Sequence, residues 1–169
     1  LKDIFALQDE ITMQLIYAMT INLTEGEQAR NWTKERPSNI KAYDKCAKGN
    51  NFFFRFNKQD NKQARLLYLE AIRLDTSWAW PYIMLGFTYT LDLFFGWSDS
   101  PLESFEKAEK NAEKALVLND SLDSAHILMG YIYLLKRQHD KAIEEGERAI
   151  ELNPNGADAH AQLGLILFY

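Results

Sequence analysis

From residue 123 onward, large and small residues recur along the chain with a fixed period. His126 and His160, and likewise Gly130 and Gly164, are each 34 residues apart. Counted from Asp123 as position 1, large residues stand at positions 4, 7 and 11, and Gly or Ala at positions 8, 20 and 27. Large residues at spacings of three and four are typical of helices. The small residues let two antiparallel helices approach closely, so the period predicts a repeated helix pair.

This pattern resembles the tetratricopeptide repeat (TPR), whose period is about 34 residues. The resemblance implies an all-α fold, a right-handed TPR superhelix of about three and a half helix–turn–helix repeats. One helix pair cannot bury its apolar face alone, so each repeat packs on its neighbours. We expect a TPR domain at residues 42–169, with repeats at 42–78, 79–122 and 123–156 and a partial one at 157–169.

The repeats depart from the pattern in three places. The first needs a longer turn, for which Asn57 to Asn61 supply turn-forming residues. The second is ten residues longer than the pattern, with the insertion lying at about Leu91 to Pro101. It ends in a capping box at Ser100 to Glu103, with Pro at the first helical position. The third has Gly146 where an aromatic residue is expected, so either a neighbour supplies the missing bulk or the helix is locally weaker.

Residues 1–41 form a separate N-terminal unit in this interpretation. An amphipathic helix is predicted from Asp3 to about Thr24, and a polar linker from Glu25 to Asn39. The apolar stripe of the helix consists of Ile4, Leu7, Ile11, Leu15 and Met19.

Three stretches carry a second resemblance: DIFALQDEIT (Asp3 to Thr12), LTEGEQAR (Leu23 to Arg30) and AYDKCAKG (Ala42 to Gly49). They resemble the junction between a TolB-like segment and TPRs in bacterial multidomain proteins that begin with a class III adenylate/guanylate cyclase domain. Similar junctions follow winged-helix transcriptional regulator domains. The resemblance implies the C-terminal part of a larger bacterial signalling protein. The chain begins with Leu1 and stops inside a repeat, which also leads us to expect a fragment.

Composition narrows the possible partners and the compartment. The formal charge is −5, and 19 basic residues are interspersed with 24 acidic ones, which argues against a nucleic-acid surface. The single cysteine, Cys46, excludes an internal disulfide framework and fits a reducing compartment, so we expect a cytoplasmic location. A membrane-associated parent stays open. No stretch approaches the ~20 apolar residues of a membrane span.

In a TPR stack, positions 2, 5, 9, 12 and 13 of each first helix line a concave groove. In this chain those positions are unusually apolar and aromatic, whereas a solvated surface is normally polar, so we expect something to cover the groove. The predicted groove residues are Tyr43, Phe53, Phe54, Trp80, Ile83, Phe87, Leu91, Ile127, Tyr131, Leu134 and Leu135.

Three functions fit this groove. It can bind the amphipathic helix or apolar peptide of a partner protein, which makes the chain an interaction or scaffolding module. Alternatively the chain is a structural spacer whose own N-terminal helix fills the groove. In the third interpretation the parent makes a cyclic nucleotide and this region regulates it.

One TPR activity is not expected here. TPRs that capture the acidic C-terminal tails of heat-shock chaperones resemble each other in having Lys at position 5 and Asn at position 9. Position 5 holds Cys46, Ile83 and Ile127, and only Asn50 matches at position 9. The carboxylate clamp is therefore absent.

The remaining candidates are an aromatic loop and the end of the chain. Phe94, Phe95 and Trp97 in the insertion form either a binding knob or a plug for the helix ends. The partial last repeat lacks a second helix over Leu167 and Phe168, so a homodimer can form through this end.

No catalytic motif is visible in the sequence. The three histidines fall in two equivalent packing positions and a turn, which does not give converging zinc ligands. We therefore expect no catalytic residues, no metal site and no cofactor.

Overall fold

The computed structural model describes residue 11 and residues 37–168. The predicted helix from Asp3 to Thr24, apart from Ile11, and residues 25–36 of the predicted linker lie outside the described residues. Residues 37–168 form seven α-helices: α3 (Ile40–Phe53), α4 (Lys58–Leu74), α5 (Ala79–Phe94), α6 (Pro101–Leu118), α7 (Asp123–Leu135), α8 (His139–Leu152) and α9 (Ala157–Phe168).

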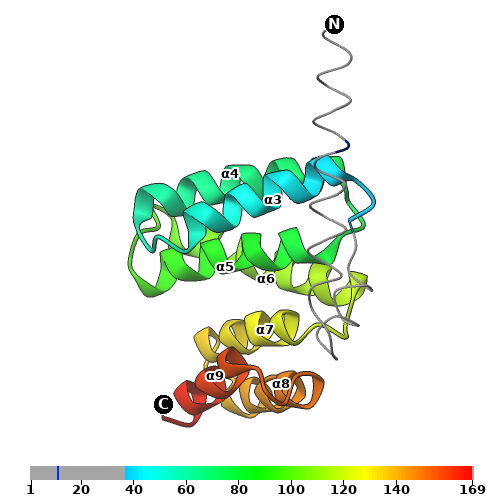
Figure 1. The fold of residues 1–169 in the computed structure, drawn as a ribbon. Helices are drawn as coiled ribbons and strands as arrows, with labels where there is room; N and C mark the ends of the chain where they lie inside the picture. Colours follow the sequence, from blue (N-terminus) through cyan, green and yellow to red (C-terminus); the bar gives the residue numbers. More distant parts are fainter. Residues whose placement is uncertain (1–10, 12–36, 169) are drawn as a thin grey trace, which may run out of the picture.

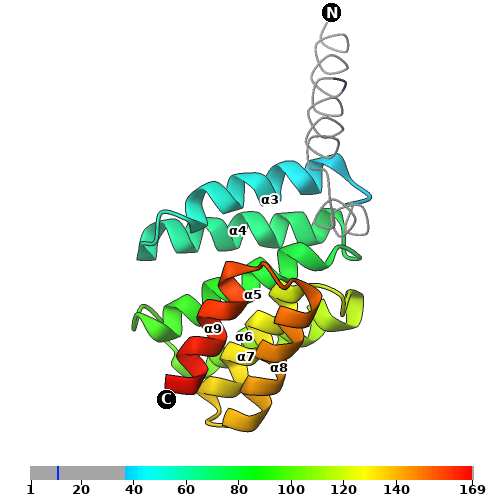
Figure 2. The ribbon, with the colours of Figure 1, turned by 60° about the horizontal axis from the view of Figure 1, so that its bottom comes forward.

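Successive helices pair and the pairs stack. Helix α3 packs on α4, α5 on α6 and α7 on α8, and each pair then packs on the next (Figure 1). Helix α5 also contacts α7, and α7 contacts α9, so the first helices of consecutive pairs lie side by side (Figure 2). This stack of helix pairs confirms the predicted all-α TPR fold.

Alanine makes the closest contacts within each pair. The alanines at positions 20 and 27 of the three second helices are all fully buried, although an alanine buries little apolar area by itself. Because each occupies so little volume, the two backbones can approach, and the large side chains of the core fill the space on either side. These alanines are Ala64, Ala71, Ala108, Ala115, Ala142 and Ala149.

The position-8 glycines Gly86 and Gly130 serve a different contact from the one that the pattern suggested, whereas a Cβ atom on Gly49 would meet Tyr68 of the same helix pair, as expected. A Cβ atom on Gly86 would lie 2.4 Å from Cδ2 of Leu128, and one on Gly130 would lie 2.6 Å from Nε2 of Gln162. Leu128 and Gln162 belong to the first helix of the following pair, and both are fully buried. Gly86 and Gly130 therefore set the spacing between consecutive repeats rather than the spacing within a pair.

Two predicted turn features differ from the structure. The turn after α3 occupies residues 54–57 rather than 57–61, because Asn57 is the N-cap of α4 and its side chain accepts a hydrogen bond from Asp60 N. Helix α6 does begin at Pro101, but Ser100 makes no side-chain capping bond. The predicted capping box is thus wrong, and Glu103 bonds Lys107 instead.

The missing bulk at Gly146 is supplied by a neighbour, which is the first of the two expected alternatives. A Cβ atom there would lie 3.2 Å from Cδ1 of Leu163, on the following helix α9. Further along α9 the apolar side chains of Leu167 and Phe168 are exposed. Homodimerisation through this end stays a prediction.

His126 joins α7 to both α8 and the preceding loop. Its Nδ1 lies 2.7 Å from Oε2 of Glu145, and its Nε2 lies 2.8 Å from the carbonyl oxygen of Asp120. Both partners are acceptors, so only the charged imidazolium donates to both. Burial lowers the pKa of His126, but the hydrogen bonds to Glu145 and Asp120 outweigh it and raise the pKa above its ordinary value.

We expect Gly86→Ala and Gly164→Ala to change stability in opposite directions. The new methyl group at position 86 meets Leu128 in a packed core, which should lower the unfolding free energy by about 1–3 kcal/mol. Among the described residues, nothing beyond the local backbone of α9 lies within 4 Å of a Cβ on Gly164, so alanine there should stabilise α9 by about 0.5–1 kcal/mol. Urea unfolding measures both, and equal effects of the two substitutions would contradict this packing.

Stability should also depend on the charge of His126. Because its folded-state pKa is raised, its contribution is complete below about pH 6.5 and is lost as the pH rises through the folded-state pKa. The unfolding free energy of the wild type should therefore fall more steeply with pH across this window than that of His126→Gln. Urea unfolding at a series of pH values tests this, and parallel curves for the two proteins would refute it.

Candidate functional site

A groove of about 450 Å³ opens on the face formed by the first helices of the pairs. Its walls come from the end of α3, from α5 and the loop after it, and from α7 and α9. Seven of the eleven predicted groove residues line it: Phe53, Phe54, Trp80, Phe87, Leu91, Ile127 and Tyr131. The structure thus brings together residues that are more than 70 positions apart, from Phe53 to Tyr131.

Four predicted groove residues lie elsewhere. Ile83 is 0% exposed, because its side of α5 packs with Ala115 and Ala125 of the following helices in the core. The ring of Tyr43 stacks on that of Trp78, with 6.5 Å between centroids. Leu134 and Leu135 are half-buried at the end of α7, outside the groove lining.

The inserted loop contributes to the groove. Phe94 and Phe95 line it, and the ring of Phe94 lies 5.6 Å from that of Tyr131 in an edge-to-face arrangement. Trp97 is outside the lining and stacks on Phe95 at 4.9 Å. Phe95 remains 56% exposed, and together with Phe94 it forms a wall of the groove.

A second aromatic wall faces the groove at the end of α3. The ring of Phe53 lies 5.4 Å from that of Phe54 and 6.1 Å from that of Phe56. Phe54 and Phe56 are 64% and 58% exposed. Phe56 was not predicted, because it follows the helix and its position depends on a backbone φ of 49° that the repeat pattern does not encode. Met84, Ala161 and Leu165 are further apolar lining residues.

The groove carries almost no charge. Among its lining residues, Asp158 is the one charged side chain, and no Lys or Arg is present. Burial, and next the nearby Asp158, raise the pKa of Tyr131, so its hydroxyl stays protonated and neutral. The site can therefore make extensive apolar and aromatic contacts with one acidic position beside them.

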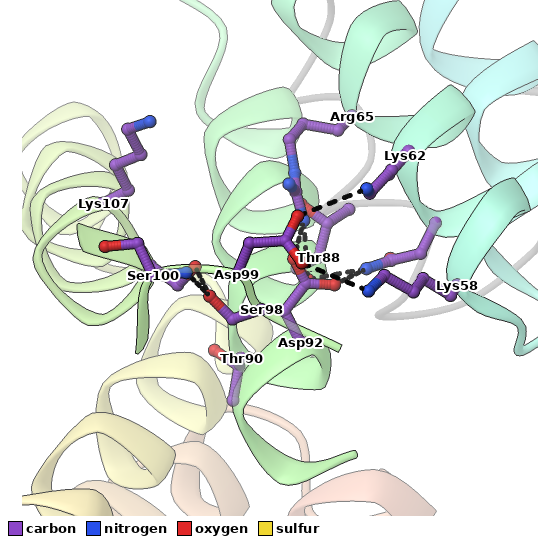
Figure 3. A network of polar contacts seen from close by, with 12 residues as sticks. Lys58, Lys62, Arg65, Thr88, Thr90, Asp92, Ser98, Asp99, Ser100 and Lys107 are labelled. Atoms are coloured by element: carbon purple, nitrogen blue, oxygen red, sulfur yellow. Dashed lines mark hydrogen bonds and ion pairs between the residues drawn. The ribbon is translucent and has the colours of Figure 1, made fainter. Parts of the chain in front are cut away.

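The end of α5, where the inserted loop begins, takes part in a polar network that the sequence did not predict (Figure 3). Arg65 Nη2 of α4 lies 2.6 Å from Oδ2 of Asp92, at the end of α5. The other carboxylate oxygen of Asp92 accepts from Asn61 Nδ2 at 2.8 Å. Nothing in the sequence pattern marks this pair, because its members are 27 positions apart and lie on two different repeats.

Two further features concern residue 11 and residues 37–168, the part of the chain that the structure describes. No group of three or more His, Cys, Asp and Glu side chains in this part is arranged to hold a metal ion. None of its helices combines the length and the apolar character needed to cross a membrane.

Solved structures of TPR domains have a fold similar to that of this chain. The first TPR of Spaghetti (RPAP3), solved bound to the HSP90 peptide SRMEEVD, superposes with a TM-score of 0.60 at 23% identity, over 78% of this chain and 94% of that one. The Arabidopsis OM64 TPR domain gives a TM-score of 0.61 at 18% identity, over 76% and 95%. The chain therefore has the fold of TPR helical-repeat domains.

Sequence comparison also finds TPR similarity in the C-terminal part of the chain. Residues 130–168 match the family described as TPR repeat. The Rhizobium meliloti (strain 1021) protein named "Putative adenylate cyclase 3" is 29% identical over 142 residues. That match covers 84% of this chain but 24% of the relative's length. The family match lies within α7, α8 and α9, and the fold of residues 37–168 is that of TPR domains.

Proposed function

We propose that this chain is a protein-interaction module whose concave groove binds an apolar segment of a partner protein, as an amphipathic helix or a short peptide. The observation that carries the proposal is the groove itself, whose aromatic walls remain exposed to solvent. Phe54, Phe56, Phe94 and Phe95 converge on one hollow from two separate loops. Exposed apolar patches of this kind mark interaction sites in proteins.

The energetic reason for binding is the removal of these rings from water. Each square ångström of apolar surface that a ligand covers is worth about 25 cal/mol before the entropic costs of association. Aromatic side chains are also rigid, so they lose little conformational freedom when a ligand orders them. A groove of about 450 Å³ has room for a few large side chains of the ligand.

The charge of the groove favours neutral or basic ligands over acidic ones. The HSP90 peptide that the similar RPAP3 domain holds ends in EEVD. In this chain the position-5 residues Cys46, Ile83 and Ile127 are all buried and uncharged, so they supply no cation for such a tail. Asp158, at the groove wall, would repel acidic residues and attract a Lys or Arg of the ligand.

We also infer that the module belongs to a larger bacterial signalling protein, in which it acts as a scaffold. The support is the relative named as an adenylate cyclase, of which this chain matches 24%. Regulation of a cyclase domain through the bound partner is the second candidate function, favoured by the same relative. A spacer role, with the groove filled by residues 3–24, is the alternative that a binding measurement separates from both.

The proposal predicts that Ala161→Arg abolishes ligand binding. Ala161 is exposed and lines the groove, so a long side chain there blocks the site without entering the core. The test is a selection of random 12-residue peptides on the wild-type chain, followed by affinity measurement by fluorescence anisotropy. We expect the enriched peptides to combine aromatic or aliphatic residues with Lys or Arg. Ala161→Arg should weaken their affinity at least tenfold.

The matched control is Ala157→Arg, which places the same side chain on α9 outside the groove lining. It should leave affinity unchanged. Peptide SRMEEVD should not bind measurably. Selection of acidic peptides, or equal weakening by both variants, would overturn the proposed groove chemistry. Failure to enrich any peptide would favour the spacer role.

A further inference from the structure

The buried ion pair behind the groove is an unusual contact in this core. The side chain of Asp92 is 4% exposed and that of Arg65 is 17% exposed. Both carboxylate oxygens of Asp92 are engaged, one by Arg65 and one by Asn61. Arg65 also bonds the carbonyl and hydroxyl oxygens of Thr88, and its guanidinium lies 4.1 Å above the ring of Tyr89. Four contacts therefore hold one guanidinium between α4 and α5.

Stability alone does not explain this arrangement. Burying two charges costs solvation free energy that their attraction often fails to repay, and well-packed apolar side chains can replace such pairs without loss of stability. The network is also incomplete, since Asn61 Oδ1 is buried without a hydrogen-bond partner among the described residues. A directional contact is useful where a segment must be held in one position.

The segment that this pair can position is the aromatic insertion. The backbone carbonyl of Asp92 accepts hydrogen bonds from Trp97 N at 2.8 Å and from Ser98 N at 3.2 Å. These two bonds close the loop that carries Phe94 and Phe95, which turns at Gly96 with a φ of 65°. Asp92 thus joins the loop through its backbone to α4 through its carboxylate (Figure 3).

The next junction in the stack offers a comparison. Glu109 stands one residue after the buried Ala108, as Arg65 stands one residue after Ala64, and it pairs with Lys136 just past the end of α7. The two junctions pair residues at equivalent positions of the repeat with the charges reversed, and the second pair is more exposed. Only three residues, 136–138, connect α7 to α8, so no aromatic loop depends on the second pair.

We propose that Arg65 and Asp92 are positioning residues that hold the aromatic insertion in place as a wall of the groove. Neither residue of the pair lines the groove. The pair acts by fixing the end of α5, from which Phe94 and Phe95 project toward Tyr131 and the hollow. That this wall matters for binding a partner rests on the proposed function. The positioning of the loop by the ion pair does not depend on the proposed function.

The test compares hydrogen exchange in the wild-type chain and in the double variant Arg65→Met, Asp92→Leu, which replaces the pair with apolar side chains. We expect the variant to keep its helical circular dichroism and to melt within a few degrees of the wild type. Exchange of the Trp97 and Ser98 amides should accelerate at least tenfold, whereas core amides such as that of Ala112 keep their protection. Peptides selected on the wild type should bind the variant at least fivefold more weakly.

The double variant Glu109→Met, Lys136→Met is the matched control, and its Trp97 and Ser98 amides should exchange as in the wild type. Equal protection of these amides in all three proteins would overturn the proposal, as would equal acceleration in both variants. If the Arg65, Asp92 variant does not fold, the exchange of the Trp97 and Ser98 amides is compared in Asp92→Asn instead. This substitution removes the charge of the carboxylate and keeps the shape of the side chain. Absence of any selected peptide would contradict the proposed function and leave the exchange result valid.

Discussion

The close approach of helices at glycine and alanine positions is the constraint on which the whole structure depends. Fully buried alanines lie between the two helices of each pair, and glycines let Leu128 and Gln162 rest against the backbone of the preceding first helix. These contacts fix both the spacing within a pair and the spacing between pairs. The relative placement of the first helices, and hence the shape of the concave face, follows from them.

The groove is a consequence of this stacking combined with two local features. Stacked first helices alone would present a shallow face; the chain adds a loop with Phe54 and Phe56 after α3 and an insertion with Phe94 and Phe95 after α5. The aromatic side chains of these segments form the walls of the groove at one end of the concave face. The insertion needs its own support, which the Arg65–Asp92 pair provides from the preceding repeat.

Much of the fold could be predicted from the sequence because the pattern of large and small residues recurs, so its period is seen more than once. The 34-residue spacing located the helix pairs, and the bulk missing at Gly146 comes from a neighbour, one of the two alternatives that the sequence left open. The site was predicted less completely. Ile83 matches a groove position but faces the core, because the side of α5 that carries it is covered by α6 and α7. Phe56 depends on an unusual backbone conformation, and the Arg65–Asp92 contact depends on tertiary packing across two repeats, neither of which periodicity reveals.

The central claim is that the concave face is the binding surface, and mapping a selected peptide on the isotopically labelled chain by nuclear magnetic resonance tests it most directly. The account predicts that the amide signals of Phe87, Tyr131 and Ala161, which line the groove on three successive first helices, shift together as the peptide is added. Shifts confined to the second helices α4, α6 and α8 would contradict it.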